Sequence, residues 1–203
     1  STVGIARIEL ESGEVLDRPT CVEPRGLAQH EGAVLVACAS GALRSHDQDS
    51  LESIDELPVP VDARDVVVAD GVILVSQFRS ADVFRVDLEA RTVAALPLPM
   101  QGLDSTTVAY RMRARGQQVA VLHQLASTQE IGVQEGGYGG SMFSGVVGCG
   151  ESIVAPAVLR FEVHQPESAA ITHLRGALSV DVDAMGEQFA VAHAGTVGRV
   201  LGT

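Results

Sequence analysis

A six-residue pattern of apolar and polar positions recurs along the chain. Its order is apolar, any residue, Arg, apolar, acidic, apolar. Complete copies lie at Ile5–Leu10, Val83–Leu88 and Val158–Val163, and a copy that matches the pattern only in part lies at Leu43–Asp47. The alternation with a period of two predicts half-buried β-strands. Each complete copy is followed by a polar turn and a shorter apolar run, so it predicts a hairpin.

A second pattern lies between these copies and consists of an alternating strand, a glycine turn and an apolar strand. The turn glycines are Gly32, Gly71, Gly116 and Gly186. Asp-Gly between two apolar runs, as at Asp70-Gly71, is a strong hairpin signal because both residue types accept a positive φ. The chain therefore alternates between two kinds of hairpin.

The spacing of the turn glycines indicates the architecture. Gly32, Gly71 and Gly116 recur at about 40 residues, and two hairpins in that length are typical of a four-stranded propeller blade. The longer step to Gly186 equals one blade plus an insertion of about thirty residues. No helical 3.6-residue period is found, and the coils of a parallel β-helix are shorter. We predict an all-β chain, a β-propeller of four-stranded antiparallel blades, with about four blades' worth of strands.

The predicted blades contain strands A to D, numbered outward from the propeller axis. The two ends of the chain supply only half blades, a C–D pair at the start and an A–B pair at the end. The halves can complete one another in a four-bladed ring, or the chain can be part of a larger ring; we favour the second because larger rings are more common. The predicted units are a half blade at 1–24, blades at 25–63, 64–102 and 103–178 (with an insertion at 124–157), and a half blade at 179–203.

The net charge of −12 narrows the classes of partner. Binding to nucleic acid needs Lys and Arg to displace phosphate counterions, and an anionic membrane surface also attracts basic segments. We therefore expect neither. No run reaches the roughly 18 apolar residues of a membrane helix. The chain begins at Ser1 without a basic and apolar leader, which fits a mature exported protein, a trimmed chain or a fragment.

Three cysteines, Cys21, Cys38 and Cys149, are present without CxxC spacing. They make no zinc site, and the lack of CxxCH excludes covalently attached c-type haem within this stretch. We expect no cofactor in this chain. One disulfide with a free thiol and three reduced thiols are both compatible with the sequence.

The blades resemble the YVTN-type repeats of bacterial β-propellers. Asp70–Val75 and Val83–Leu88 carry the resemblance best, although the YVTN tetrad is missing. Two further stretches, Val121–Gln124 and Gly136–Gly140, together with Cys149 and the run from Ile153 to Val158, look like exported propellers that are joined to, or work beside, a c-type cytochrome or di-haem peroxidase-like domain. The resemblance implies a periplasmic or extracellular binding domain whose protein partner carries the haem.

Candidate site residues gather on one predicted face. The B–C and D–A connections of a propeller emerge on the same side, here called the loop face. His123 and His193 fall at equivalent positions at the ends of B strands, where they can hold a metal or relay protons, or simply cap strand ends. Arg25 and Arg64 precede A strands and can bind a carboxylate or phosphate, or form salt bridges between blades.

The insertion leaves from the same face. Its glycine-rich run from Gly132 to Gly150 lacks the Gly-Lys-Ser/Thr ending of a phosphate loop, and no nucleophile elbow is present. Tyr138, Met142 and Phe143 are its apolar anchors and candidate partner contacts, or they pin the loop to its own propeller. A docking loop or lid is the favoured interpretation.

Two functions remain open. The first is a non-catalytic binding or scaffold domain that presents the loop face to a protein partner, a periplasmic redox protein by the resemblance. The alternative is a propeller enzyme such as a metal-dependent, lactonase-like hydrolase with inward-facing ligands from several blades. The innermost strands offer a poor ligand set, and Asp181 and Asp183 can instead pair with Arg111 or Arg113. The innermost-strand starts are Arg25, Arg64, Asp104 and Ser179.

Overall fold

The computed structural model describes residues 3–99, 104–127, 154–174, 178–186 and 188–194, and in these residues the chain consists of strands and turns. The all-β prediction is confirmed. The strands are β1 (Gly4–Ile8), β2 (Val15–Pro19), β3 (Pro24–His30), β4 (Ala33–Cys38), β5 (Ala42–Asp47), β6 (Ser53–Pro58), β7 (Ala63–Ala69), β8 (Val72–Gln77), β9 (Val83–Asp87), β10 (Thr92–Ala95), β11 (Asp104–Arg115), β12 (Gln118–Ser127), β13 (Val154–Glu162), β14 (Gln165–His173), β15 (Leu178–Met185) and β16 (Gln188–Ala194).

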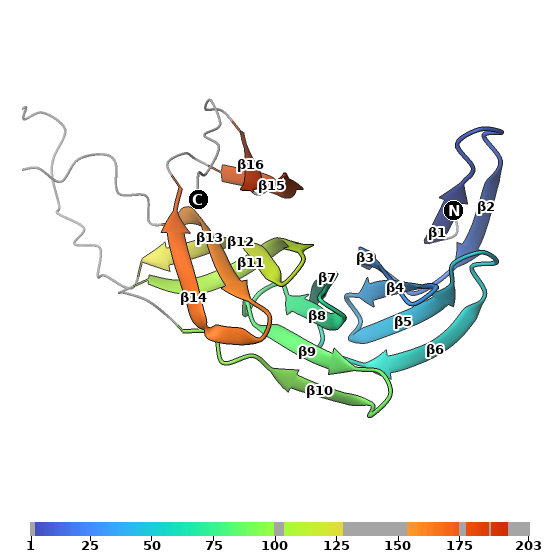
Figure 1. Cartoon of the computed structure of the whole chain (residues 1–203), viewed down its shortest axis with the longest axis horizontal. Coiled ribbons are helices and arrows are strands. Elements are labelled where there is room, and N and C mark those ends of the chain that lie inside the picture. Colours follow the sequence, from blue (N-terminus) through green and yellow to red (C-terminus); the bar gives the residue numbers. More distant parts are fainter. Residues whose placement is uncertain (1–2, 100–103, 128–153, 175–177, 187, 195–203) are drawn as a thin grey trace, which may run out of the picture.

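The strands form antiparallel sheets in which sequence neighbours pair. Three sheets have four strands, β3 to β6, β7 to β10 and β11 to β14, and two have only two strands, β1–β2 and β15–β16. Figure 1 shows the sheets placed one after another along an arc, with β6 and β10 on its outer rim. The innermost strand β7 contacts both β3 and β11, and β11 contacts β15. This is the arrangement of propeller blades around an axis.

The tight turns between the first two strands of each blade are set by residues that accept a positive φ. Glu31 and Gly32 have φ values of 47° and 79°, and Asp70 and Gly71 have 47° and 78°. Two consecutive residues of this kind make the turn whose twist suits a two-residue hairpin. In the third sheet Arg115 pairs with Gln118, so Gly116 takes the first turn position rather than the second.

The hydrophobic core lies between blades rather than within any one of them. One cluster joins Leu35 and Leu43 of the first blade to Ile73 and Val75 of the second. The next cluster joins the second blade to the third, and another joins the third blade to β15 and β16. Because the second strands β4 and β8 have both faces covered by neighbouring sheets, they are nearly continuous apolar runs, such as Val72–Val75.

A disulfide between Cys21 and Cys38 ties the first half blade to the first complete blade. Cys21 follows β2, and Cys38 ends β4. Both are buried in a cluster that also holds Ile5 of β1 and Val36. Of the alternatives left open by the sequence, the structure therefore has a disulfide between these two cysteines. Cys149 lies outside the described residues.

The strands around the predicted insertion are longer than expected. β12 runs to Ser127 and β13 begins at Val154, so both ends of the predicted segment 124–157 are strand. The two strands pair without interruption from Gln118–Glu162 to Ala126–Val154. The sequence pattern did not predict this extension, because Pro156 and its alanine neighbours Ala155 and Ala157 are residue types depleted in strands. No helix in the described part of the chain is long and apolar enough to cross a membrane.

Candidate functional site

A bulge repeats at one position in every innermost strand. The pairing register shifts between Pro24 and Gly26, between Ala63 and Asp65, between Ala109 and Arg111, and between Ser179 and Asp181. A bulge leaves one extra residue unpaired and re-aims its side chain. The residues at this position are Arg25, Arg64, Tyr110 and Val180.

Three of these bulge residues gather around one aromatic ring on the loop face. We call Arg25, Arg64, Phe78 and Tyr110 the arginine–aromatic cluster. The guanidinium carbons of Arg25 and Arg64 lie 5.7 and 5.3 Å from the centroid of the Phe78 ring. The rings of Phe78 and Tyr110 meet edge to face, with centroids 5.8 Å apart. These distances are within the range of cation–π and aromatic attraction.

Backbone hydrogen bonds hold the cluster in place. Phe78 follows β8 in a B–C connection, and its amide donates to the carbonyl of Asp62 at 2.9 Å. The Phe78 carbonyl accepts from the amide of Ala109 in β11, also at 2.9 Å. The Tyr110 hydroxyl donates to Oε1 of Gln124 at 2.9 Å. The ring is thus fixed between two blades before any partner binds.

The two arginines differ in how their charges are compensated. Arg25 donates from Nη1 to Oδ1 of Asp62 at 2.9 Å and from Nη2 to Oε2 of Glu23 at 3.2 Å. Arg64 donates from Nε to the carbonyl of Tyr110 at 3.2 Å, and no carboxylate among the described residues pairs with it. Arg25 therefore forms salt bridges, one of them to Asp62 in the connection between β6 and β7, whereas Arg64 bonds to a neutral acceptor in the third blade.

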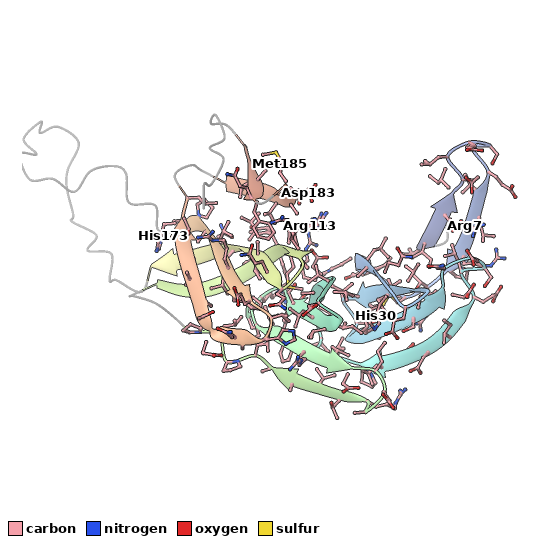
Figure 2. The ribbon with its side chains drawn as sticks, viewed as in Figure 1. Arg7, His30, Arg113, His173, Asp183 and Met185 are labelled. Atoms are coloured by element: carbon pink, nitrogen blue, oxygen red, sulfur yellow. A yellow bond between two sulfur atoms is a disulfide. The ribbon has the colours of Figure 1, made fainter. Side chains whose placement is uncertain are left out.

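The innermost strands also carry a charged groove of about 570 Å³ along the axis, lined in part by Arg25, Asp65, Arg111 and Arg113. Here arginines neutralise the aspartates. Arg111 Nε lies 3.6 Å from Oδ1 of Asp181, and Arg113 lies 3.5 Å from Oδ1 of Asp183. Figure 2 shows Arg113 and Asp183 close together between β11 and β15. Of the two roles weighed for Asp181 and Asp183, cation binding or pairing with arginine, the structure has the pairing.

Asp65 is the buried acid of this groove, with an exposed fraction of 2%. Its carboxylate accepts hydrogen bonds from the amides of Met112, at 2.8 Å, and Val66, at 3.1 Å. Burial raises the pKa of Asp65, and the Met112 amide and the nearby guanidinium groups of Arg111 and Arg113 partly oppose that rise. The hydrogen bond from the Met112 amide to Asp65 connects the second blade to the third. Asp65 therefore joins two innermost strands and is not free to bind a cation.

The two candidate metal-binding histidines occupy equivalent backbone positions. His123 pairs with Ala109 and His193 pairs with Ser179, and each of these partners directly precedes the bulge residue of its strand. His123 lies inside β12 rather than at its end, because that strand continues to Ser127. Its side chain is 2% exposed, and burial lowers its pKa to about 4. Neither ring nitrogen has a hydrogen-bond partner within the described residues.

No group of three or more metal-ligating side chains occurs in the described portion of the chain. The predicted metal role of His123 and His193 stays a prediction. Tyr138, Met142 and Phe143, the predicted partner contacts in the insertion, lie outside the described residues.

Sequence reasoning found the two arginines of the cluster but not its aromatic residues. Phe78 had a signal, because it is one of few aromatic residues and stands directly after a B strand. Tyr110 had none, because β11 begins at Asp104, earlier than its counterparts do. The equivalents of Arg25 and Arg64 are therefore Tyr110 and Val180, not Asp104 and Ser179. Only the repeated bulge reveals this correspondence.

Comparison with known proteins supports the β-propeller fold and identifies neither a family nor an activity. No protein-family profile and no curated protein matches the sequence. The fold is similar to that of a chain of the nidogen/laminin complex, with a TM-score of 0.62 at 12% identity over 94% of this chain and 64% of that one. It is also similar to the Pan2 WD40 domain of Neurospora crassa, with a TM-score of 0.58 at 12% identity over 90% of this chain and 51% of that one.

Hydrazine synthase from Kuenenia stuttgartiensis gives a TM-score of 0.54 at 12% identity, over 93% of this chain and 67% of that one. This chain thus spans about two thirds or less of the length of these three proteins. At such low identity the similarity shows the β-propeller fold alone. It does not single out the YVTN-type family.

Proposed function

We propose that this chain is a non-catalytic β-propeller binding domain that presents its loop face to a protein partner. The observation that carries the proposal is the arginine–aromatic cluster. Arginine, tyrosine and phenylalanine are enriched at protein interfaces, and arginine and tyrosine recur among the residues that dominate binding energy. In this chain they gather at one partly exposed place, although aromatic residues make up only 3% of the sequence.

The rigidity of the cluster supports a docking role. A side chain that is ordered before association loses little conformational entropy when a partner arrives. The amide and the carbonyl of Phe78 are each hydrogen-bonded to a neighbouring segment, and the Tyr110 hydroxyl is already bonded to Gln124. The cluster thus resembles a prepared contact surface more than a flexible surface patch.

The groove of the innermost strands favours binding over the hydrolase alternative. A metal-dependent hydrolase needs several inward carboxylates or imidazoles with open coordination sites. Arg111 and Arg113 of this groove pair with Asp181 and Asp183 of β15, and Asp65 accepts two backbone hydrogen bonds. A cation here would have to displace those arginines.

The finer part of the proposal is a periplasmic or extracellular redox partner, a c-type cytochrome domain in particular. It rests on the resemblance of the blades to YVTN-type repeats and on the insertion motif. The Cys21–Cys38 disulfide adds support, since structural disulfides persist mainly in oxidising compartments. Haem then belongs to the partner or to an associated domain, because this chain has no CxxCH motif.

The experiment is capture followed by footprinting. The immobilised chain is incubated with a periplasmic extract of its source, and each captured protein is identified and examined for haem absorption. The purified complex is then footprinted with hydroxyl radicals. We expect the side chains of Phe78 and Tyr110 to be protected, and exposed Ile54 of β6 and Val15 of β2, two strands that carry no member of the cluster, to serve as unprotected controls.

The outcomes separate the two parts of the proposal. A stoichiometric partner without haem would leave the binding function standing and reject the cytochrome. Protection confined to other surfaces would reject the loop face. A chain that forms no stoichiometric complex would reject the proposed function as a whole.

A further inference from the structure

We propose that Arg64 is a carboxylate-binding residue, and that the partner segment it receives is acidic, with Asp or Glu side chains that dock onto the arginine–aromatic cluster. This inference rests on the proposed function, because it names the chemistry of the segment that the loop face recognises. It assigns different roles to the two arginines that sequence reasoning had treated alike.

The first step is the charge balance around the Phe78 ring. Two guanidinium groups approach the same ring, at 5.7 and 5.3 Å from its centroid. The charge of Arg25 is compensated by Asp62 and Glu23. No described carboxylate pairs with Arg64. Asp62 is shared with Arg79, whose Nε lies 3.6 Å from its Oδ2, so three arginine cations stand against two carboxylates and the remaining positive charge attracts an anion.

The second step is the geometry of the Arg64 side chain. Its Nε donates to the Tyr110 carbonyl at 3.2 Å, and its guanidinium lies over the Phe78 ring. These contacts fix the plane of the guanidinium and leave Nη1 and Nη2 without a partner among the described residues. A planar arginine with two adjacent free donors matches the two oxygens of a carboxylate.

The third step is selectivity. The chain carries a net charge of −12, so an acidic segment is repelled by most of its surface. Attraction is therefore confined to places where cations are not balanced by nearby acids. Arg91, in contrast, is an arginine that already lies 2.6 Å from Oδ2 of Asp55 and also donates to the Glu56 carbonyl. It offers a matched control at another place on the molecule.

The test uses a fluorescent peptide of six glutamates and a matched peptide of six glutamines, titrated into the purified chain at low ionic strength. We expect saturable binding of the glutamate peptide only. Substitution Arg64→Gln should weaken it by at least about tenfold, which is the effect of losing one good charged pair. Arg91→Gln should change it less than twofold. Arg64→Lys keeps the charge but loses the planar fork, so we expect an intermediate affinity.

Equal affinities of the wild type, Arg64→Gln and Arg91→Gln, or no saturable binding of the glutamate peptide, would overturn the inference. Circular dichroism of each variant checks that it is folded, and Arg64→Lys provides a test if Arg64→Gln is not. Inorganic phosphate is titrated in parallel, and phosphate binding without peptide binding would reject carboxylate as the ligand. Capture of the partner to the same extent by Arg64→Gln would contradict this inference alone, whereas the absence of any partner would contradict the proposed function.

Discussion

His123 shows how a single buried ring can make the stability of the whole chain depend on pH. It stands between two alanines, Ala109 and Ala157, in the pairing register of β12, and these small neighbours leave room for the imidazole. The ring is 2% exposed, and burial lowers its pKa from 6.5 to about 4. A protonated imidazole is costly there, because the charge would lose its water without gaining a described partner.

We expect the free energy of unfolding to fall as the pH is lowered from 6.5 towards 4. In that range the unfolded chain takes up a proton at His123 and the folded chain does not, so protons favour the unfolded state. Between pH 7 and pH 5 the loss from this residue is about 2 kcal/mol. Substitution His123→Leu should remove that part of the pH dependence in urea unfolding, and an unchanged profile would contradict the depressed pKa.

Asp65 should act in the opposite direction. Its pKa is raised by burial from the ordinary 3.8, so its neutral form favours folding. That stabilisation is complete below pH 3.8 and is lost as the pH rises through the raised pKa. Asp65→Asn keeps an acceptor for the Met112 amide but cannot ionise. Its stability relative to wild type should therefore improve from pH 4 to pH 7, as measured by urea unfolding.

The companion variant Asp65→Ala removes the acceptor itself. We expect it to lose about 1–3 kcal/mol at any pH, because the buried Met112 amide is left without a partner. An Asp65→Asn variant as unstable as Asp65→Ala would show that charge, and not the hydrogen bond between blades, is the main contribution of this residue.

At the scale of elements, the hairpin β1–β2 relies on its attachment to the first blade. It forms a two-stranded sheet, and an isolated two-stranded hairpin has little stability in water. The apolar contacts of Ile5 and Cys21 and the disulfide to Cys38 supply the attachment. His46 adds a polar link: its Nδ1–H donates to the Leu51 carbonyl, and its Nε2 accepts from the Thr20 hydroxyl beyond β2.

Removing the disulfide by the double substitution Cys21→Ser/Cys38→Ser should lower the free energy of unfolding by about 2–4 kcal/mol. The unfolded chain then gains conformational freedom, and the hairpin loses its covalent link. Relative to the wild type, we expect hydrogen exchange, measured by mass spectrometry, to become faster in β1 and β2 and to change less in β8. Cys149→Ser is the control, and an equal loss in that variant would point away from the Cys21–Cys38 bond.

At the scale of the whole molecule, the arc ends in two half blades, and the described strands of these two half blades do not pair with each other. In the described residues β1 pairs only with β2, and β16 pairs only with β15. Figure 1 places the two hairpins at separate ends of the arc. Within the described residues, the edge of β1 that faces away from β2 and the edge of β16 that faces away from β15 therefore have no strand partner, and such edges are where sheets add further strands.

We expect the outward amides of β1 and β16 to exchange with solvent much faster than those of the central strands β4, β8 and β12. The measurement is amide hydrogen exchange resolved by residue with NMR, at a low protein concentration. Protection of both edges, equal to that of β8, would mean that the edges are paired in solution. If that protection depended on protein concentration, the edges would pair between two copies of the chain. If it did not, β1 and β16 would pair with each other within one chain.

The repeated hairpins, their order and the blade architecture could be predicted from the sequence alone, because they depend on short-range features. A period of two selects strands, and residues such as Asp70 and Gly71 accept the positive φ that the turns require. The tertiary structure alone decided which cysteines pair, that Tyr110 rather than Asp104 corresponds to Arg64, and that Arg25 is compensated while Arg64 is not. The physical reason is that these features arise where side chains from different blades meet, and no local pattern records which residues the packing of the blades will bring together.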